Sequence, residues 1–164
     1  MEVLDNCALI SSVCAFRLVN SAKATSYSSW LMASLFTKIV NGEIPCYKVA
    51  ETDQYLAFLD ISPLKRGHTL CIPKVEVDHW VDLAPDTFSG LMEFSQKVAK
   101  AIQKTIPTER IGIIVAGFEV PHTHIHLIPA NTMKDMDFNN PKLQIEKAEF
   151  EAIAQVIQMN FKAL

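Results

Sequence analysis

The longest amphipathic pattern in the chain runs from Asp86 to about Ile106. Apolar or small side chains recur there every three or four residues, at Phe88, Leu91, Ser95, Val98, Ile102 and Ile106. This spacing matches the 3.6-residue turn of an α-helix and gives the helix one apolar face. Pro107 follows, and proline cannot continue a helix. The pattern therefore predicts one long helix that packs on a sheet.

Five shorter runs have the character of β-strands. They are CYKVAE at 46–51, QYLAFLD at 54–60, HTLCIPK at 68–74, RIGIIVAGF at 110–118 and HTHIHLIPA at 122–130. Branched and aromatic residues favour strands, and turn-forming residues separate the first three runs. The last two runs are joined by the brief EVP segment. These runs predict about five strands with mainly antiparallel neighbours.

Two shorter helical patterns flank the strands. SLFTKIVNGEI at 34–44 ends at Asn41 and Gly42, because glycine tolerates the left-handed conformation that closes helices. A C-terminal pattern from about Lys147 to Phe161 also has apolar residues at helical spacing. The sequence thus predicts an α+β fold with a five-stranded, mainly antiparallel sheet, one long helix on it and a C-terminal helix.

Composition and charge exclude several classes of partner. Of the 164 residues, 49% are apolar and 20% charged, which is typical of one globular domain. The formal charge of −3 offers no basic surface for a nucleic acid polymer. No apolar run approaches the ~20 residues of a membrane span. The four cysteines lack zinc-motif or disulfide spacing, which favours a reducing compartment. We therefore predict a cytoplasmic protein without membrane or nucleic acid partners.

Residues 1–31 differ in character from the rest of the chain. They contain short apolar pieces and many serines and alanines without a clear period. Glu2 and Asp5 stand where a secretory signal would be basic, and Arg17 interrupts the apolar stretch. We expect residues 1–31 to be a poorly ordered extension and residues 32–164 to form the domain.

The stretch PHTHIHLIP at 121–129 carries three of the five histidines at alternate positions. Alternate side chains of a strand point to one face, so His122, His124 and His126 would form a row with neighbours about 6.6 Å apart. A buried imidazole without hydrogen-bond partners costs about 1–3 kcal/mol. Three in register on an apolar strand therefore indicate a function rather than packing alone.

A metal site is one such function. Two imidazoles at i and i+2 can share a zinc ion, whose nitrogen ligands lie at about 2.0–2.1 Å, but a third at i+4 reaches it only if the strand bends. The remaining ligand would then be remote in sequence, and the candidates are His68, His79 and Glu119.

Nucleophilic catalysis is another function. A neutral imidazole has a lone pair on one nitrogen, and a pKa of about 6.5 leaves most of it unprotonated at neutral pH. The negative charge of a phosphate does not repel an uncharged attacking atom. The ring needs an acceptor that selects its tautomer, and the phosphoryl oxygens need hydrogen-bond donors. A central ring with two neighbours meets these requirements.

The motif HTHIHLIP resembles that of the histidine triad (HIT) family, which is His-x-His-x-His followed by apolar residues. The similarity extends upstream through FTKIVNGEIPCYKVAETDQYLAFLDISPLKRGHTLCIPK and covers about residues 34–130. This resemblance implies a HIT-like fold and a homodimeric enzyme without cofactor or metal. Such an enzyme is a nucleoside-phosphate hydrolase or nucleotidyl transferase that acts at the α-phosphate through a nucleotidyl-histidine intermediate. It releases a nucleoside monophosphate from a phosphoramidate or a dinucleoside polyphosphate.

The resemblance also implies catalytic roles for three histidines and a substrate-binding role for a fourth, His68. His124, in the middle of the motif, looks like the nucleophile. His122 and His126 look like flanking catalytic partners that contact the phosphate and orient the central ring. His68, in GHTLCIPK, matches an upstream histidine at the phosphate end. His79 lies outside the motif, so we interpret it as a surface residue.

The resemblance implies a nucleoside site as well. Asp60 matches a carboxylate that accepts hydrogen bonds from ribose hydroxyls, and Ile61 looks like part of the base pocket. Phe36, Ile39 and Leu59 are further candidates for the pocket, although core packing is the simpler role of each. The loop residues Lys65 and Arg66 lie near the phosphate end in sequence, although such charges are more often solvated.

The chain departs from the family pattern just before the first histidine of the motif. Better-known branches have Gln and then Ser or Thr there as phosphate donors, where this chain has Phe118 and Glu119. Ala116 stands near the usual position of a phosphate-contacting Asn. Glu119, as a substrate-binding residue, would orient a histidine, act as a base on water or contact an amine of the leaving group. A solvated loop carboxylate is the other interpretation.

A second departure from the family pattern concerns a structural metal site. Some relatives hold zinc with Cys-x-x-Cys before the first helix, where this chain has Ser34 and Thr37, so we predict no structural zinc.

Two alternative functions remain. The main alternative is a nucleotide-binding regulatory module with little turnover, which the departure at 118–119 favours. A metal-dependent hydrolase that uses His68 and two histidines of the motif, His122 and His124, is the third hypothesis.

Overall fold

The computed structural model describes residues 33–164, so the extension expected at 1–31 lies outside the described residues. In chain order, the helices and strands are α2 (Leu35–Val40), β1 (Lys48–Glu51), β2 (Tyr55–Leu59), β3 (Thr69–Pro73), α3 (Pro85–Thr105), β4 (Arg110–Ile114), β5 (Ile125–Ala130) and α4 (Lys147–Lys162). Two short 3-10 helices are η1 (Trp80–Asp82) and η2 (Met133–Met136). Each helix and strand of the sequence prediction is therefore present.

The five strands form one sheet in the order β1-β2-β3-β5-β4. All neighbouring pairs are antiparallel, so the α+β class and the antiparallel sheet are confirmed. Strand β5 lies between β3 and β4 inside the sheet, whereas β1 and β4 are the edges. The histidine-rich segment therefore leads into an interior strand that is held on both sides.

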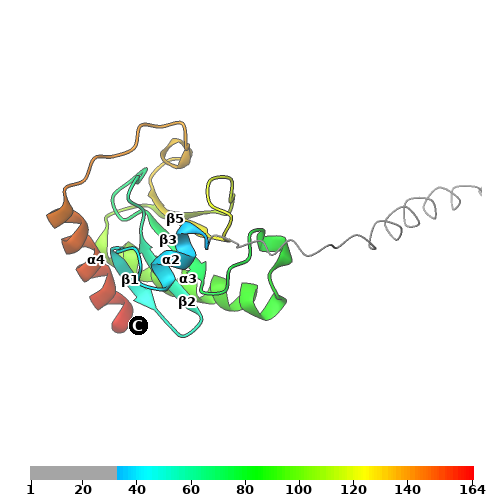
Figure 1. Cartoon of the computed structure of the whole chain (residues 1–164). Coiled ribbons are helices and arrows are strands. Elements are labelled where there is room, and N and C mark those ends of the chain that lie inside the picture. Colours follow the sequence, from blue (N-terminus) through cyan, green and yellow to red (C-terminus); the bar gives the residue numbers. More distant parts are fainter. Residues whose placement is uncertain (1–32) are drawn as a thin grey trace, which may run out of the picture. The chain divides into compact units, whose positions relative to one another are not determined.

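The two faces of the sheet are covered by different helices (Figure 1). On one face, Ala57 and Leu59 of β2 belong to the apolar core that includes Leu91 of α3. On the other face, Leu56 and Phe58 pack with Phe36 of α2. Burial on both faces explains why every residue of β2 is buried. The packing of the long helix on the sheet is thus confirmed.

Local sequence sets the ends of the helices. Pro85 occupies the first turn of α3, where its fixed φ and missing N–H are tolerated. Ile106 is extended, as expected of a residue before proline, and it ends α3. Gly42, with φ 78°, follows the last turn of α2 as predicted. Helix α4 packs against α3 and β1, with the ring of Phe150 stacked 4.6 Å from that of Tyr47.

The predicted extents of the last two strands are wrong. Strand β5 begins at Ile125 rather than at residue 122, and β4 ends at Ile114 rather than at residue 118. The ladder between β3 and β5 ends at the pair of Cys71 and Ile125. Beyond it stand Pro73 and Pro121, and proline has no N–H for a ladder bond.

The residues just before β5 are held by other contacts. The main-chain N–H of Thr123 donates to the oxygen of Val77 at 2.7 Å, and that of His122 to the oxygen of Val120 at 2.8 Å. Two of the three motif histidines therefore lie in a turn-like segment that leads into the sheet. Within residues 33–164, no helix has the length and apolar character needed to cross a membrane.

Candidate active site

The four histidines of the prediction lie together on the α2 face of the sheet. His126 pairs in register with Leu70, which packs with α2, so both side chains point to that face. The ring centroids of His68 and His126 are 5.3 Å apart, and those of His126 and His124 are 4.9 Å apart. His122 continues the row on the far side of the Phe36 ring, which contacts both His122 and His124. All four imidazoles are buried.

The main chain fixes the tautomer of His124. Its Nδ1 atom lies 2.7 Å from the main-chain oxygen of His122. A carbonyl oxygen only accepts, so Nδ1 carries the proton and donates it. The Nε2 atom of the neutral ring is then left with a lone pair, and no hydrogen bond from another residue in 33–164 reaches it. This is the state that a nitrogen nucleophile requires.

A chain of hydrogen bonds fixes the tautomers of His68 and His126. The N–H of Leu64 donates to Nδ1 of His68 at 3.2 Å, so the proton of His68 lies on Nε2. That Nε2–H donates to Nδ1 of His126 at 3.1 Å. His126 therefore carries its proton on Nε2. Burial lowers the pKa of both rings to about 3, with a smaller effect of Lys142 on His68 and of His68 on His126. Both rings are neutral donors at physiological pH.

His122 is held at both ring nitrogens. Its Nε2–H donates to the oxygen of Pro73 at 2.8 Å, and the hydroxyl of Ser34 donates to its Nδ1 at 3.0 Å. The bond to Pro73 holds the segment before β5 against the end of β3, where main-chain pairing between the two strands has stopped. Burial lowers the pKa of His122. The ring is thus fixed and neutral, presents no free proton and lines neither of the two cavities beside His124.

A cavity of about 290 Å³ lies between α2, the end of β2 and the histidines, and we name it the α2 cavity. Five of the residues proposed from the sequence line it: Asp60, Ile61, Glu119, His124 and His126. The three further candidates for the base pocket, Phe36, Ile39 and Leu59, line it too. Asp60 is held by the N–H of Ser62, which donates to its Oδ1 at 2.8 Å. The cavity therefore combines an apolar wall with two carboxylates, Asp60 and Glu119, and two imidazoles.

A second cavity of about 300 Å³ lies on the other side of the same imidazoles, and we name it the loop cavity. Its lining residues are Ile114, Ala116, Gly117, Phe118, Glu119, His124, His126 and Phe138. Three residues, Glu119, His124 and His126, line both cavities. The imidazoles thus stand where the two cavities meet.

Comparison with known proteins identifies this arrangement. Residues 41–133 match the model of the HIT domain, and this range exceeds half of the chain. The chain belongs to the HIT family. The adenosine 5'-monophosphoramidase hnt1 of Schizosaccharomyces pombe is 36% identical over 134 residues, which cover 80% of this chain and 100% of that relative. The predicted family is therefore confirmed.

Two further comparisons place this HIT protein among its relatives. The adenylylsulfatase HINT3 of Arabidopsis thaliana is 35% identical over 100 residues, which cover 58% of this chain and 51% of that protein. The crystal structure of a Hit-like protein involved in cell-cycle regulation, from Bartonella henselae, superposes with a TM-score of 0.68 at 30% identity. The superposition covers 77% of this chain and 95% of that one. At the level of the family, the named relatives support nucleotide hydrolysis.

Sequence reasoning missed two side chains at this HIT site. The loop between β5 and α4 brings Phe138 against His126, with ring centroids 5.0 Å apart. Lys142 Nζ lies 5.0 Å from the centroid of the Phe138 ring. Only the presence of an aromatic residue in a polar loop marked this segment in the sequence, and the loop has no periodicity that predicts where it returns.

Other charged candidates lie away from the histidines. Lys65 pairs with Asp135 at 2.7 Å and Arg66 with Glu149 at 2.5 Å, so neither side chain is directed to the cavities. His79 is 70% exposed, which confirms its interpretation as a surface residue.

A possible metal site in this HIT protein differs from the set that the sequence suggested. The ligand atoms of Asp60, His68 and His126 lie within 4.8 Å of one another. A metal there would compete with the hydrogen bonds of Leu64 to His68 and of His68 to His126, which already use three ring nitrogens. The geometry favours a hydrogen-bonded chain, and the absence of a resident metal stays a prediction.

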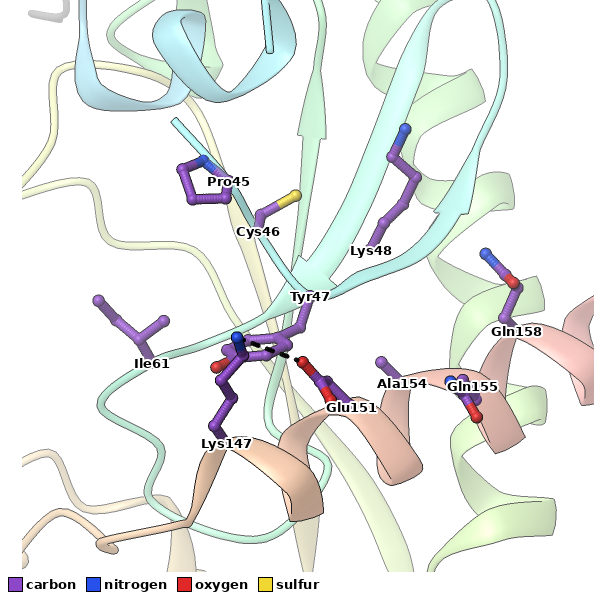
Figure 2. Close-up of a pocket in the computed structure, with 10 residues that line it drawn as sticks. All are labelled: Pro45, Cys46, Tyr47, Lys48, Ile61, Lys147, Glu151, Ala154, Gln155 and Gln158. Atoms are coloured by element: carbon purple, nitrogen blue, oxygen red, sulfur yellow. Dashed lines mark ion pairs between the residues drawn. The ribbon is translucent and has the colours of Figure 1, made fainter. Parts of the chain in front are cut away.

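Another cavity, of about 560 Å³, lies between β1 and α4 and has no histidine in its lining. Figure 2 shows its lining residues, among them the ion pair of Lys147 and Glu151, 3.7 Å apart. It shares Pro45, Cys46 and Ile61 with the α2 cavity, so it adjoins the end that is farther from the imidazoles. The smaller cavities, rather than this one, hold groups with the chemistry of a catalyst.

Proposed function

We propose that this HIT protein is a nucleoside-phosphate hydrolase or nucleotidyl transferase in which His124 is the nucleophile. One observation carries the proposal. The hydrogen bond from Nδ1 of His124 to the oxygen of His122 leaves the Nε2 lone pair on a ring that stands between the two cavities. A nucleotide bridging the cavities would bring its α-phosphorus to that ring.

The proposed reaction has two displacements. The Nε2 atom of His124 forms a bond to the α-phosphorus while the bond from phosphorus to the leaving group breaks. The leaving group takes up a proton from solvent in the open loop cavity. Water then attacks the phosphorus and gives up a proton to solvent, the bond to His124 breaks with its electron pair returning to Nε2, and a nucleoside monophosphate leaves. In a transferase, another nucleophile replaces this water.

The neighbouring residues have the properties that this reaction needs. His126, with its proton on Nε2, would donate to the phosphoryl oxygens in a buried setting, where a preorganised donor contributes most. His68 holds His126 in that tautomer. Asp60 would accept hydrogen bonds from the ribose, and Ile61 would cover the base at the rim of the α2 cavity, where its side chain is 74% exposed.

The loop cavity supports an amine as the leaving group. Its lining is mainly apolar, with Phe138 on one side and Phe118, which is 95% exposed, at the edge. Glu119 is the one carboxylate in the described lining, which also contains two imidazoles. A carboxylate repels an anionic leaving group and attracts an ammonium group. We therefore favour cleavage of a P–N bond over that of a P–O–P bond, in agreement with the phosphoramidase activity named for the fission yeast relative.

The covalent intermediate provides the decisive test. A quenched reaction with an adenosine phosphoramidate should show the mass of a nucleotidyl group on the peptide that contains His124. His124→Asn should bind the nucleotide and form no adduct, whereas His79→Asn, at the exposed histidine, should form it normally. Absence of the adduct with phosphoramidate, dinucleoside polyphosphate and nucleotidyl sulfate alike would contradict the proposal.

A nucleotide-binding regulatory module is the second candidate function. Glu119 favours it, because an exposed carboxylate stands where a donor to the phosphate would speed the reaction. Tight binding of a nucleoside monophosphate with no burst in a single-turnover assay is the outcome expected of such a module.

We also propose that the protein is a cytoplasmic homodimer. Strand β4 forms an open edge of the sheet in the described chain, and its Ile113 is 49% exposed. An edge strand with exposed apolar residues favours pairing with a second copy. Light scattering after size exclusion should give twice the mass of one chain, and Ile113→Lys should lower it to one.

A further inference from the structure

A carboxylate outside the cavities is connected to the histidine motif through two hydroxyl groups. Glu76 lies in the loop after β3, and its Oε2 atom accepts hydrogen bonds from the main-chain N–H of Ser34, at 3.0 Å, and from the hydroxyl of Thr37. These bonds lower the pKa of Glu76, so the acceptor stays ionised. Ser34 and Thr37 belong to the start of α2, about forty residues earlier in the chain.

The number of hydroxyl protons decides which hydroxyl donates to Nδ1 of His122. The hydroxyl oxygens of Ser34 and Thr37 lie 3.0 Å and 3.4 Å from Nδ1 of His122, so either could donate to it. Each hydroxyl has one proton. Because Glu76 takes the proton of Thr37, the proton of Ser34 is the one that remains for Nδ1 of His122, with the Thr37 oxygen, 3.1 Å from Ser34 Oγ, as a second acceptor. Ser34 Oγ in turn accepts the N–H of Thr37 at 3.1 Å.

The position of His122 matters because its main-chain oxygen selects the tautomer of His124. With Ser34 on Nδ1 and Pro73 on Nε2, the ring of His122 cannot turn without losing a hydrogen bond. A fixed ring holds the main chain of His122, and its oxygen stays 2.7 Å from Nδ1 of His124. Hydrogen bonds, together with the covalent frame of His122, therefore connect Glu76 to the ring of His124.

We propose that Glu76 is a positioning residue for the nucleophile and acts through Thr37, Ser34 and His122. We name these four residues the clasp. The inference rests on the proposed function in one respect, the role of His124 as the attacking group. Glu76 contacts neither cavity, so it is not assigned to the catalytic or binding residues.

A purely structural role of the clasp has a different signature. Ser34 caps α2 through its bond to the N–H of Thr37, and this cap needs no carboxylate. If Glu76 only anchored the loop to α2, its removal would lower thermal stability and leave the rate of adduct formation unchanged. If it positions the nucleophile, the rate falls while nucleotide affinity is kept, because geometry at the reacting atoms controls the rate more steeply than binding.

Matched variants separate these two roles. Glu76→Ala and Thr37→Val break the clasp, whereas Glu76→Gln keeps an oxygen acceptor and Thr37→Ser keeps the hydroxyl. Glu51→Ala is the control. Glu51, the last residue of β1, is also a surface carboxylate with two partners, Lys48 and Lys74, but within residues 33–164 it makes no hydrogen bond or ion pair to the clasp. Single-turnover adduct formation, nucleotide affinity and Tm are measured for each variant.

We expect Glu76→Ala and Thr37→Val to slow adduct formation about 10-fold, with nucleotide affinity within about 2-fold of the wild type. Glu76→Gln, Thr37→Ser and Glu51→Ala should stay within about 2-fold in rate. A rate of adduct formation that Glu76→Ala leaves unchanged, or that Glu51→Ala lowers equally, would overturn the proposal.

Nitrogen-15 NMR of the imidazoles tests the clasp without any turnover. In the wild type, His124 should show a protonated Nδ1 and an unprotonated Nε2, and Glu76→Ala should convert this pattern into a mixture of tautomers. An unaltered tautomer pattern in Glu76→Ala would also overturn the inference. If no substrate forms an adduct but the tautomers respond to Glu76, the clasp stands and the proposed function fails.

Discussion

The Nε2 atom of His68 lies 3.1 Å from the Nδ1 atom of His126, with both rings buried beneath the cavities. The proton of His68 occupies this contact, so His126 must present its own proton on the opposite nitrogen. A second proton on either ring would place two N–H groups face to face or displace the N–H of Leu64. The pair is therefore stable only while both rings are neutral.

Stability should depend on pH because of this pair. Burial lowers the pKa of His68 and His126 to about 3, whereas the unfolded chain takes up these protons near pH 6.5. Between these values the unfolded state binds more protons, so the free energy of unfolding falls as the pH drops below about 6.5. The slope is at most about 1.4 kcal/mol per pH unit for each ring.

Urea unfolding between about pH 7.5 and about pH 5.5 measures this slope, in a range where carboxylates stay ionised. His126→Asn should make it shallower, because one titrating ring is gone and the amide oxygen still accepts from His68. His79→Asn should leave it unchanged, since that side chain is exposed. A stability that is independent of pH over this range would show that the buried pair takes up protons as readily as the unfolded chain.

Asp60 should distinguish nucleotides by their ribose. Its carboxylate lines the α2 cavity, and a hydrogen bond to a charged group contributes about 1.5–3 kcal/mol. Asp60→Ala should therefore raise the KM of a ribonucleoside phosphoramidate about 10- to 100-fold. The same substitution should have little effect on the 2',3'-dideoxy analogue, which lacks both hydroxyls.

Steady-state kinetics of the wild type and Asp60→Ala, each with the ribose and the dideoxy substrate, give the four values of a double-mutant-type cycle. Asp53→Ala, in the exposed turn between β1 and β2, is the matched control and should alter neither KM. If Asp60→Ala raises the KM of the ribose and the dideoxy substrate equally, Asp60 does not bind the ribose hydroxyls but acts in folding or at the phosphate end.

Glu119 should select among leaving groups by its charge. It lines the loop cavity, so Glu119→Gln should raise kcat/KM for a dinucleoside polyphosphate about 2- to 5-fold, the range typical of exposed charges. A phosphoramidate with a neutral leaving group should respond little. Glu109→Gln, at an exposed carboxylate before β4, is the control.

Salt provides an independent check on Glu119. Because its side chain is exposed, the effect of Glu119→Gln should shrink when the ionic strength rises from about 0.05 M to about 0.5 M, since the Debye length falls over this range. If neither Glu119→Gln nor salt changes the ratio of kcat/KM for the polyphosphate to that for the phosphoramidate, a charge effect of Glu119 is excluded.

The helix α3 shows how far local sequence can be read. Its apolar spacing and the prolines at 85 and 107 set its ends to within one residue of the prediction, because both signals act within single turns. The start of β5 was misplaced by three residues, since alternation persists through His122 and His124 although no strand is available to pair with them. Ladder pairing depends on the neighbour, and the decisive proline on β3 lies some fifty residues away.

The site was predicted in part for the same reason. Of the residues named from the sequence, the fold brings His124, His126, Asp60, Ile61 and Glu119 to one pair of cavities, whereas His122 and His68 line neither. No periodicity or motif predicts where Phe138 and Glu76 lie, because each belongs to a loop whose path is set by distant packing.

By itself, the sequence determined the α+β class, the long helix and the family, because periodicity and a contiguous motif are properties of neighbouring residues. Only the tertiary structure decided which nitrogen of each imidazole carries the proton. For His68, His126 and His122 that choice depends on Leu64, Pro73 and Ser34, which are distant from the motif in the chain, and for His124 it depends on the path of the main chain at His122. A proton is directed by the nearest acceptor in space, and folding brings that acceptor into place.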